Sequence, residues 1–232
     1  MKPTVAWEDG GALSASYRAR WHGDDFAVFS YTPARYLRYR DNPASPLVWA
    51  FKDEDREAMR VAVEWSLRTL PKLEPRLRAA GCRTVVAVPR STAGKPNVGC
   101  EAIAAALAEG LGIAHLPHAL VRTESVPPSH LGERVSADRH FETIVFTGSA
   151  GPSVAGLYCR VCDKHFRTPG GLDWHIANNA AHARRAATDG AGNVLIVDDL
   201  FTHGATSAAV RRVFRERHGV ERVLGFFLAR TG

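Results

Sequence analysis

The segment 194–206, with the sequence VLIVDDLFTHGAT, constrains the fold of this chain more than any other stretch. It opens with four apolar residues, three of them β-branched, which is the pattern of a strand buried in a parallel sheet. Two adjacent carboxylates, Asp198 and Asp199, come next, followed by a turn of hydroxyl-bearing and small residues. Helical periodicity then predicts a helix over 206–218. The segment therefore predicts a strand–turn–helix unit with two acidic side chains where the strand ends.

The rest of the chain alternates between predicted strands and predicted helices. Further apolar runs predict strands at 84–88, near 116–121, at 143–146 and at 222–229. Helical periodicity predicts two further helices, over 53–70 and over 98–111. This alternation is typical of an α/β fold, in which a parallel sheet carries helices on both faces.

Local signals set the ends of these two helices. Asp53 is the predicted N-cap of the first, and Pro71 is predicted to end it. Gly112 is the predicted C-terminal cap of the second. Before them, the aromatic-rich stretch 13–31 alternates apolar and polar residues and predicts a β-hairpin.

The turn after the two carboxylates has the composition of a phosphate site. Backbone amides at a helix start have no partner within the helix and attract anions. Gly204 and Ala205 would let a phosphate approach closely, and Thr202 and Thr206 add hydroxyl donors. Neighbouring carboxylates repel an anion unless they face sugar hydroxyls or a bound metal. A phosphorylated sugar therefore fits better than free phosphate, the alternative being an acidic strand–turn–helix with no phosphate role.

The same segment resembles the phosphoribosyl pyrophosphate (PRPP) binding motif of type I phosphoribosyltransferases. The resemblance implies that Asp198 and Asp199 hold the ribose 2- and 3-hydroxyls, with Mg²⁺ accompanying PRPP. It also implies that the turn cradles the 5-phosphate through Thr202, His203, Gly204, Ala205 and Thr206. His203 stands where threonine is common in the family.

More of the chain resembles the ComF-like branch of this family. The stretch 85–91, followed by Pro96 and Asn97 and an alanine-rich helix, carries part of the resemblance. Arg122, the stretch 131–139 leading to Phe146, and the closing segment 228–230 carry the rest. The resemblance implies the type I phosphoribosyltransferase fold, a parallel sheet flanked by helices. The N-terminal aromatic hairpin could be the hood that stacks on an acceptor base, or its half-buried aromatics could be core.

The loop after strand 84–88 supplies candidates for the pyrophosphate. Displacing pyrophosphate develops negative charge on the leaving group, which calls for hydrogen-bond donors and Mg²⁺. Arg90, Ser91 and Lys95 are the candidates, and Arg90 joins the two aspartates as a catalytic candidate. Ordinary solvated loop residues are the alternative.

The polar stretch 123–140 resembles in position the mobile loop that closes over such sites. Arg134, Arg139 and His140 could then reach the pyrophosphate, or could be solvated loop charges. Enzymes of the family that act on 6-oxopurines place a carboxylate where this chain has Thr202. A hypoxanthine or guanine transferase is therefore disfavoured.

A second motif lies in the segment 156–187. Its spacing, C-x2-C-x12-H-x6-H, predicts a zinc finger with the ligands Cys159, Cys162, His175 and His182, in which the last gap is one residue longer than the common range. Two thiolates and two imidazoles complete a tetrahedral zinc shell. The helix positions that normally contact bases hold threonine, glycine and tryptophan, which cannot make bidentate base contacts. The finger therefore indicates structural Zn²⁺ or binding of nucleic acid by shape, rather than sequence-specific DNA binding.

These inferences divide the chain into four segments. They are an N-terminal aromatic hairpin or hood (1–50), a phosphoribosyltransferase core in two parts (51–155 and 188–232) and an inserted finger (156–187). The net charge of +6 suits an anionic ligand. An acidic N-terminus in place of a signal-peptide core, and no apolar run of about 18 residues, predict a cytoplasmic protein without membrane segments.

Two functions are compatible with these features. The first is transfer of the phosphoribosyl group of PRPP to an unidentified, nitrogenous small-molecule acceptor, with release of pyrophosphate. The second is a ComF-like, non-catalytic protein that senses PRPP or binds nucleic acid through the finger. Water could also serve as the acceptor, and the protein could form a homodimer.

Overall fold

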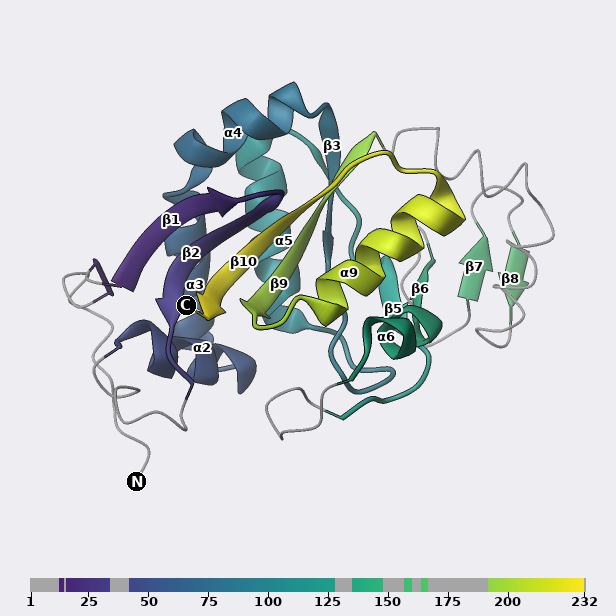
Figure 1. The fold of residues 1–232 in the computed structure, drawn as a ribbon, viewed down its shortest axis with the longest axis horizontal. Coiled ribbons are helices and arrows are strands. Elements are labelled where there is room, and N and C mark those ends of the chain that lie inside the picture. Colours follow the sequence, from purple (N-terminus) through teal and green to yellow (C-terminus); the bar gives the residue numbers. More distant parts are fainter. Residues whose placement is uncertain are drawn as a thin grey trace.

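The computed structural model describes residues 13, 14, 16–33, 42–127, 135–147, 157–159, 164–166 and 192–231. Its centre is a sheet of six strands in the order β1-β2-β10-β9-β3-β4 (Figure 1). The strands are β1 (Tyr17–His22), β2 (Asp25–Tyr31), β10 (Val223–Thr231), β9 (Asn193–Phe201), β3 (Cys82–Ala87) and β4 (Ala114–His115). β1 and β2 pair antiparallel, and every other neighbouring pair in this sheet is parallel.

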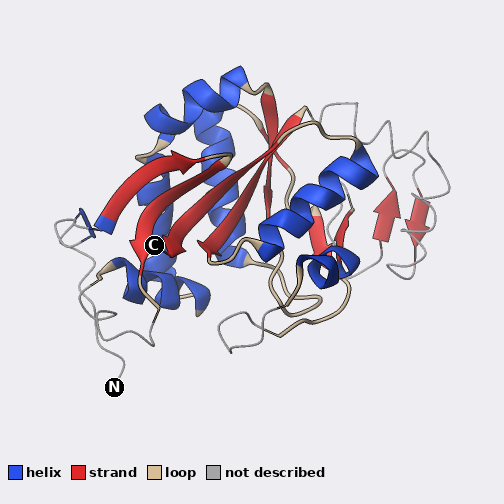
Figure 2. Ribbon diagram, in the orientation of Figure 1, coloured by secondary structure: helices blue, strands red, loops and turns tan. Residues whose placement is uncertain are grey.

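Helices cover both faces of the sheet, as Figure 2 shows. The larger elements are α2 (Ala44–Lys52), α3 (Arg56–Leu67), α4 (Leu70–Ala79), α5 (Val98–Leu111) and α9 (Ala205–Arg212), which continues as a π-helical turn, η3 (Val213–Arg217). A small antiparallel pair, β5 (Leu120–Arg122) and β6 (Ile144–Phe146), lies beside the sheet with α6 (Ala137–Thr143). The predicted α/β class, with a mostly parallel sheet between helices, is confirmed.

The order of the strands reverses between β3 and β9. The chain leaves β3 through α5 to reach β4 on one side, and leaves β9 through α9 to reach β10 on the other. Side chains of β9 alternate between the two cores: Leu195 packs in the cluster that holds Ile103 of α5, and Ile196 in the one that holds Val210 of α9. The two helices therefore cover opposite faces, and the gap between β3 and β9 is a topological switch point, where open α/β sheets bind ligands.

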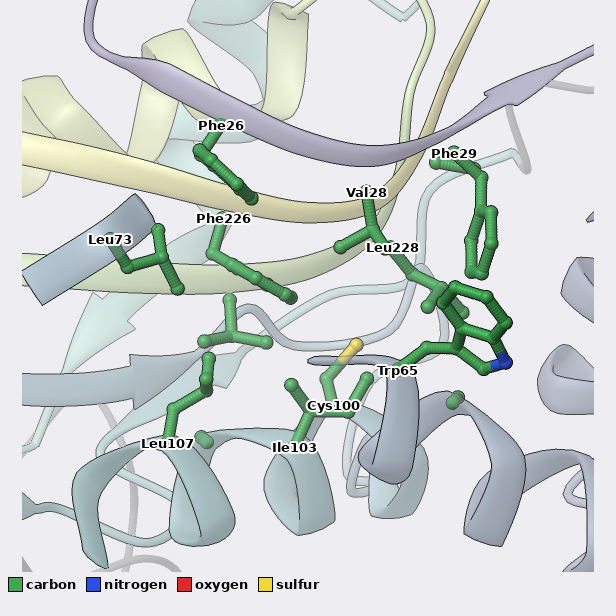
Figure 3. Packing of buried hydrophobic residues seen from close by; sticks show 14 of the residues in the cluster. Phe26, Val28, Phe29, Trp65, Leu73, Cys100, Ile103, Leu107, Phe226 and Leu228 are labelled. Carbon is green, nitrogen blue, oxygen red and sulfur yellow. The ribbon is translucent and has the colours of Figure 1, made fainter. Parts of the chain in front are cut away.

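The predicted N-terminal hairpin is present, but it forms the edge of the central sheet. Strand β2 pairs in parallel with β10, with Phe26 opposite Phe226. The rings of these two residues stack with centroids 6.0 Å apart, and Phe29 meets Trp65 of α3 at 5.4 Å (Figure 3). The aromatic face of the hairpin is therefore buried between the sheet and α3, which agrees with the core alternative and not with the hood.

The helix expected over 53–70 is present as α3, which is three residues shorter at each end, and the preceding helix α2 was not predicted. Helix α2 ends at Lys52, Glu54 adopts a left-handed backbone with φ 61°, and α3 begins after Asp55, whose side chain accepts the Ala58 N–H at 3.0 Å. Asp55 rather than Asp53 is thus the N-cap. Pro71 does not end a helix but lies in the first turn of α4, where the missing N–H costs nothing.

The segment 194–206 forms the predicted strand, turn and helix, but the strand is longer than expected. Strand β9 pairs with β10 as far as Phe201, opposite Arg230. Its pairing with β3 ends at Val197, opposite Ala87. Asp198 and Asp199 therefore lie within the strand, at the point where it has a neighbour on one side only.

Other predicted strands are shifted. The strand expected near 116–121 is replaced by β4, which ends before it, and by β5, which overlaps its last two residues. The strand expected at 143–146 is β6. Within the predicted finger, β7 (Leu157–Cys159) and β8 (Lys164–Phe166) form an antiparallel pair. The other three predicted zinc ligands, Cys162, His175 and His182, lie outside the described residues. Among the helices described, none has both the length and the apolar character to cross a membrane.

Candidate functional site

A cavity of about 520 Å³ opens at the switch point between β3 and β9. The last contact across this gap is the Val88 N–H, which donates to Val197 O at 2.8 Å. Beyond it the chain after β3 turns away, while β9 continues beside β10. Side chains from the end of α2, the loop after β3, β5, α6 and the end of β9 line the space. They include Trp49, Lys52, Arg90, Ser91, Arg122, His140, Asp198, Asp199, Phe201, Thr202, His203, Gly204, Ala205, Thr206 and Ser207.

The two carboxylates lie side by side in this cavity. The backbone N–H of Asp199 donates to Oδ1 of Asp198 at 2.9 Å. Burial, and then the charge of Asp199, raise the pKa of Asp198 above its usual value. The site therefore holds two acidic groups that repel each other, and a cation or hydroxyl donors are needed to balance them.

Lys52 supplies one such balance. Its Nζ lies 3.2 Å from Oδ1 of Asp199, and both side chains are partly buried. Burial acts to lower the pKa of Lys52, but the charges of Asp199 and Asp198 outweigh it and raise the pKa overall. Lys52 is therefore an ammonium ion inside the cavity. The sequence motif gave no signal for it, because Lys52 belongs to a different element and meets β9 only in the fold.

The turn after β9 has the geometry of an anion-binding helix start. Gly204 is the N-cap of α9, with φ 74° and ψ 6°. A side chain there would also collide with a neighbour, since an added Cβ would lie 2.9 Å from Cζ of Phe201. The first amides of α9, at Ala205 and Thr206, have no carbonyl partner within the helix and border the cavity. The turn can therefore receive an anion close to its backbone.

Two of the three residues that were expected to reach the site from the loop after β3 do so. Arg90 and Ser91 line the cavity, whereas Lys95 is exposed and is not among the lining residues. Arg90 is held at the corner between α2 and α3, because Nη1 lies 2.9 Å from Oε1 of Glu54 and Nη2 donates to the Lys52 carbonyl. A ligand would therefore have to compete with Glu54 and the Lys52 carbonyl for the Arg90 guanidinium.

A second, buried arginine also lines the cavity. Arg122 donates from Nε to Arg90 O at 2.8 Å and from Nη1 to Thr143 Oγ1 at 2.7 Å. Its Nη2 lies 3.3 Å from Nδ1 of His140, and Nε2 of His140 lies 3.4 Å from Oγ1 of Thr206. Burial lowers the pKa of Arg122 to about 10, which leaves it charged at neutral pH.

The polar stretch 123–140 is described only in part. His140 lies beside the turn after β9 rather than at the β3 loop, where the pyrophosphate was expected. Arg139 is exposed and pairs with Glu124 at 2.7 Å, so the structure does not bring it to the cavity. Arg134 lies outside the described residues.

The donor set fits magnesium in the presence of a phosphorylated ligand. Mg²⁺ is commonly held by one or two carboxylates together with substrate phosphates and water. Asp198 and Asp199 supply two carboxylates on one wall of the cavity. Among the described residues, no group of three or more acidic, histidine or cysteine side chains is arranged around a common metal position.

The comparisons with known proteins add no assignment. No protein-family model matches the chain, and no curated protein matches it. The functional interpretation therefore depends on the geometry and charge of this cavity.

Proposed function

We propose that this protein binds PRPP with Mg²⁺ and transfers the phosphoribosyl group to a nitrogenous acceptor, releasing pyrophosphate. One observation carries the proposal. The two carboxylates at the end of β9 and the turn that starts α9 border the same cavity, at the topological switch point of a parallel sheet. In this view the chain has the type I phosphoribosyltransferase fold that its sequence resembles.

Each part of the ligand has a counterpart in the cavity. Asp198 and Asp199 accept hydrogen bonds from the ribose hydroxyls, so the two carboxylates face the sugar and not the phosphate. The amides of the turn, with Thr202 and Thr206, hold the 5-phosphate. This arrangement explains why two carboxylates can lie next to an anion site without expelling the anion.

The leaving group needs positive charge. Lys52 and Arg90 line the same cavity as the turn and can hold the pyrophosphate as negative charge develops on it. When bound with PRPP, Mg²⁺ would neutralise part of the same charge. Thr202 occupies the position where 6-oxopurine enzymes carry a carboxylate, so an acceptor that must lose a proton to that group is not expected.

The finger is proposed to be a separate zinc module inserted between β6 and β9. The β7–β8 pair agrees with the strand pair that opens a ββα finger. The ligands would be Cys159, Cys162, His175 and His182. A non-catalytic PRPP sensor remains the second candidate, and turnover distinguishes the two.

The test is a calorimetric titration of PRPP with Mg²⁺ into the wild type, Asp199→Asn and Asp24→Asn. Asp24 is a matched control, since it is an ion-paired aspartate outside the cavity lining. We expect the wild type and Asp24→Asn to bind, and Asp199→Asn to bind at least about tenfold more weakly. No binding by the wild type would overturn the proposal.

Turnover is then measured as pyrophosphate release with a panel of nitrogenous acceptors. Release that requires an acceptor identifies a transferase, and release without one identifies a hydrolase. Binding without release identifies the sensor.

A further inference from the structure

A chain of three side chains connects the interior of the molecule with the phosphate turn. Arg122, at the end of β5, is buried and approaches Nδ1 of His140 with Nη2 at 3.3 Å. The other ring nitrogen of His140, Nε2, lies 3.4 Å from Oγ1 of Thr206. All three residues line the cavity, and Thr206 is the second residue of α9.

The chemistry of the donors fixes where the protons lie. A guanidinium can only donate, so Nδ1 of His140 must accept from Arg122 and carries no proton. Burial, and then the charge of Arg122, lower the pKa of His140 to about 4, so the ring is neutral at neutral pH. A neutral ring has one proton, which must then be on Nε2. Nε2–H therefore donates to the Thr206 oxygen, and the hydrogen of that hydroxyl must point elsewhere.

Two further hydrogen bonds hold the Arg122 guanidinium in place beside Nδ1 of His140. Its Nε donates to Arg90 O at 2.8 Å and its Nη1 to Thr143 Oγ1 at 2.7 Å. The Thr143 hydroxyl in turn donates to Arg139 O at 3.0 Å, within α6. The guanidinium is thus fixed between the loop after β3 and the helix that carries His140.

We infer that Arg122 and His140 are positioning residues that hold the Thr206 hydroxyl as a hydrogen-bond donor toward a phosphate oxygen in the cavity. The inference rests on the proposed function, because it takes the 5-phosphate as the ligand of the turn. Phosphate oxygens accept hydrogen bonds, so a hydroxyl whose hydrogen is kept away from His140 is free to donate to a phosphate oxygen in the cavity. His140 does not touch the ligand; it acts through Thr206.

The first test needs no ligand. Long-range ¹H–¹⁵N NMR spectra distinguish the two neutral tautomers of a histidine, and loss of signals in His140→Phe assigns the ring. At neutral pH we expect His140 to be protonated on Nε2 alone, and to remain so in Thr206→Val, because Arg122 sets the tautomer. A His140 protonated on Nδ1, or a mixture of both tautomers, would overturn the inference.

The second test is a double-mutant cycle with ribose 5-phosphate, which carries the phosphate without the pyrophosphate. Thr206→Val should weaken binding about tenfold and His140→Phe several-fold. The double variant should be no weaker than Thr206→Val alone, because His140 acts only through that hydroxyl. His218→Phe is the matched control, since His218 is also a buried histidine but lies outside the cavity lining, and its affinity should stay at the wild-type level.

The outcomes separate the two proposals. If the fold losses of ribose 5-phosphate affinity of the two single variants multiply in the double variant, the positioning role of His140 is overturned. The proposal that the protein binds PRPP is then unaffected. A wild type that shows the expected tautomer but binds neither ribose 5-phosphate nor PRPP would overturn the proposed function, and with it phosphate as the ligand of Thr206.

Discussion

Nζ of Lys52 lies 3.2 Å from Oδ1 of Asp199, which joins the last residue of α2 to the strand that carries both carboxylates. The two side chains expose 29% and 18% of their surface, so water screens the pair only in part. Asp198, the next residue, adds a second acidic group to the same wall. The ammonium of Lys52 therefore balances part of the charge that a bound metal or sugar would otherwise have to balance.

Lys52→Met should destabilise the protein without ligand by about 1–3 kcal/mol, because the partly buried Asp199 carboxyl would lose its positively charged partner. Mg²⁺ should then stabilise this variant more than the wild type, since the ion replaces the lost positive charge. Thermal unfolding with and without MgCl₂ measures both effects. Lys95→Met, which removes an exposed lysine outside the cavity lining, is the control. Equal responses of all three proteins to Mg²⁺ would contradict the prediction.

Asp198→Asn should stabilise the protein without ligand and abolish PRPP binding. Because the pKa of Asp198 is raised, the folded protein holds this proton more tightly than the unfolded chain does. Stability should therefore fall as the pH rises from about 4, the ordinary value of an aspartate, through the raised value. Asparagine removes that loss, with an expected gain of about 1 kcal/mol near neutral pH.

Urea denaturation of the wild type and Asp198→Asn at about pH 5 and about pH 7.5 checks this prediction. The gain in stability should be larger at the higher pH. An equal gain in the free energy of unfolding at both pH values would show that ionisation of Asp198 does not destabilise the folded protein.

Local signals in the sequence predicted the elements that are determined locally. Helix α5 has the predicted bounds, because Asn97 caps its start and Gly112, with φ 65°, ends it. The strand and turn of 194–206 were also correct in kind. The separate helix α2 and the later start of α3 were missed, because they depend on the left-handed backbone of Glu54, which no residue type there signals.

The site was predicted in part. Besides the segment 194–206, the loop after β3 indicated Arg90 and Ser91 and the polar stretch indicated His140, whereas Lys52 was not among the candidates. The carboxylates and the turn are neighbours in sequence, so a single motif indicated both. Lys52, Arg122 and His140 come from separate elements, and only the packing of α2, β5 and α6 around β9 brings them to the cavity. Lys95 was a pyrophosphate candidate only because it lies in the loop after β3, and in the structure it is exposed to solvent.

Gly204→Ala should destabilise the protein by about 2 kcal/mol or more and weaken binding of PRPP. The residue has φ 74°, which costs an L-residue about 1 kcal/mol, and the added Cβ would lie 2.9 Å from the Phe201 ring. Gly219→Ala separates the two causes, because Gly219 has φ 65° with no atom within 4 Å of an added Cβ. Chemical denaturation should show a smaller loss for Gly219→Ala. Equal losses would mean that Phe201 moves aside freely.

His218→Phe should make the protein more resistant to acid. Burial, and then the charge of Arg217, lower the pKa of His218 to about 4. A histidine with a lowered pKa destabilises the fold as the pH falls from about 6.5 toward that value, because the unfolded chain takes up the proton first. Its Nδ1 is buried without a hydrogen-bond partner in the described part of the chain, and its ring packs against Phe146 with centroids 4.9 Å apart.

Phenylalanine keeps that packing and removes the proton site. Urea denaturation should therefore show little change near neutral pH and a clear gain at about pH 5. A loss of stability at both pH values would instead indicate that the His218 ring has a polar contact that phenylalanine cannot replace.

Metal analysis of the whole chain should find a single zinc ion, and Cys162→Ser should lose it, because zinc needs the thiolate as ligand. Cys82→Ser is the control and should keep the metal. Cys82 lies at the start of β3, where burial raises the pKa of its thiol to about 11, so it is protonated at neutral pH and a poor ligand. Full zinc content in Cys162→Ser would mean that Cys162 is not a zinc ligand and that another residue completes the set. The ligand assignment from the C-x2-C-x12-H-x6-H spacing would then be wrong.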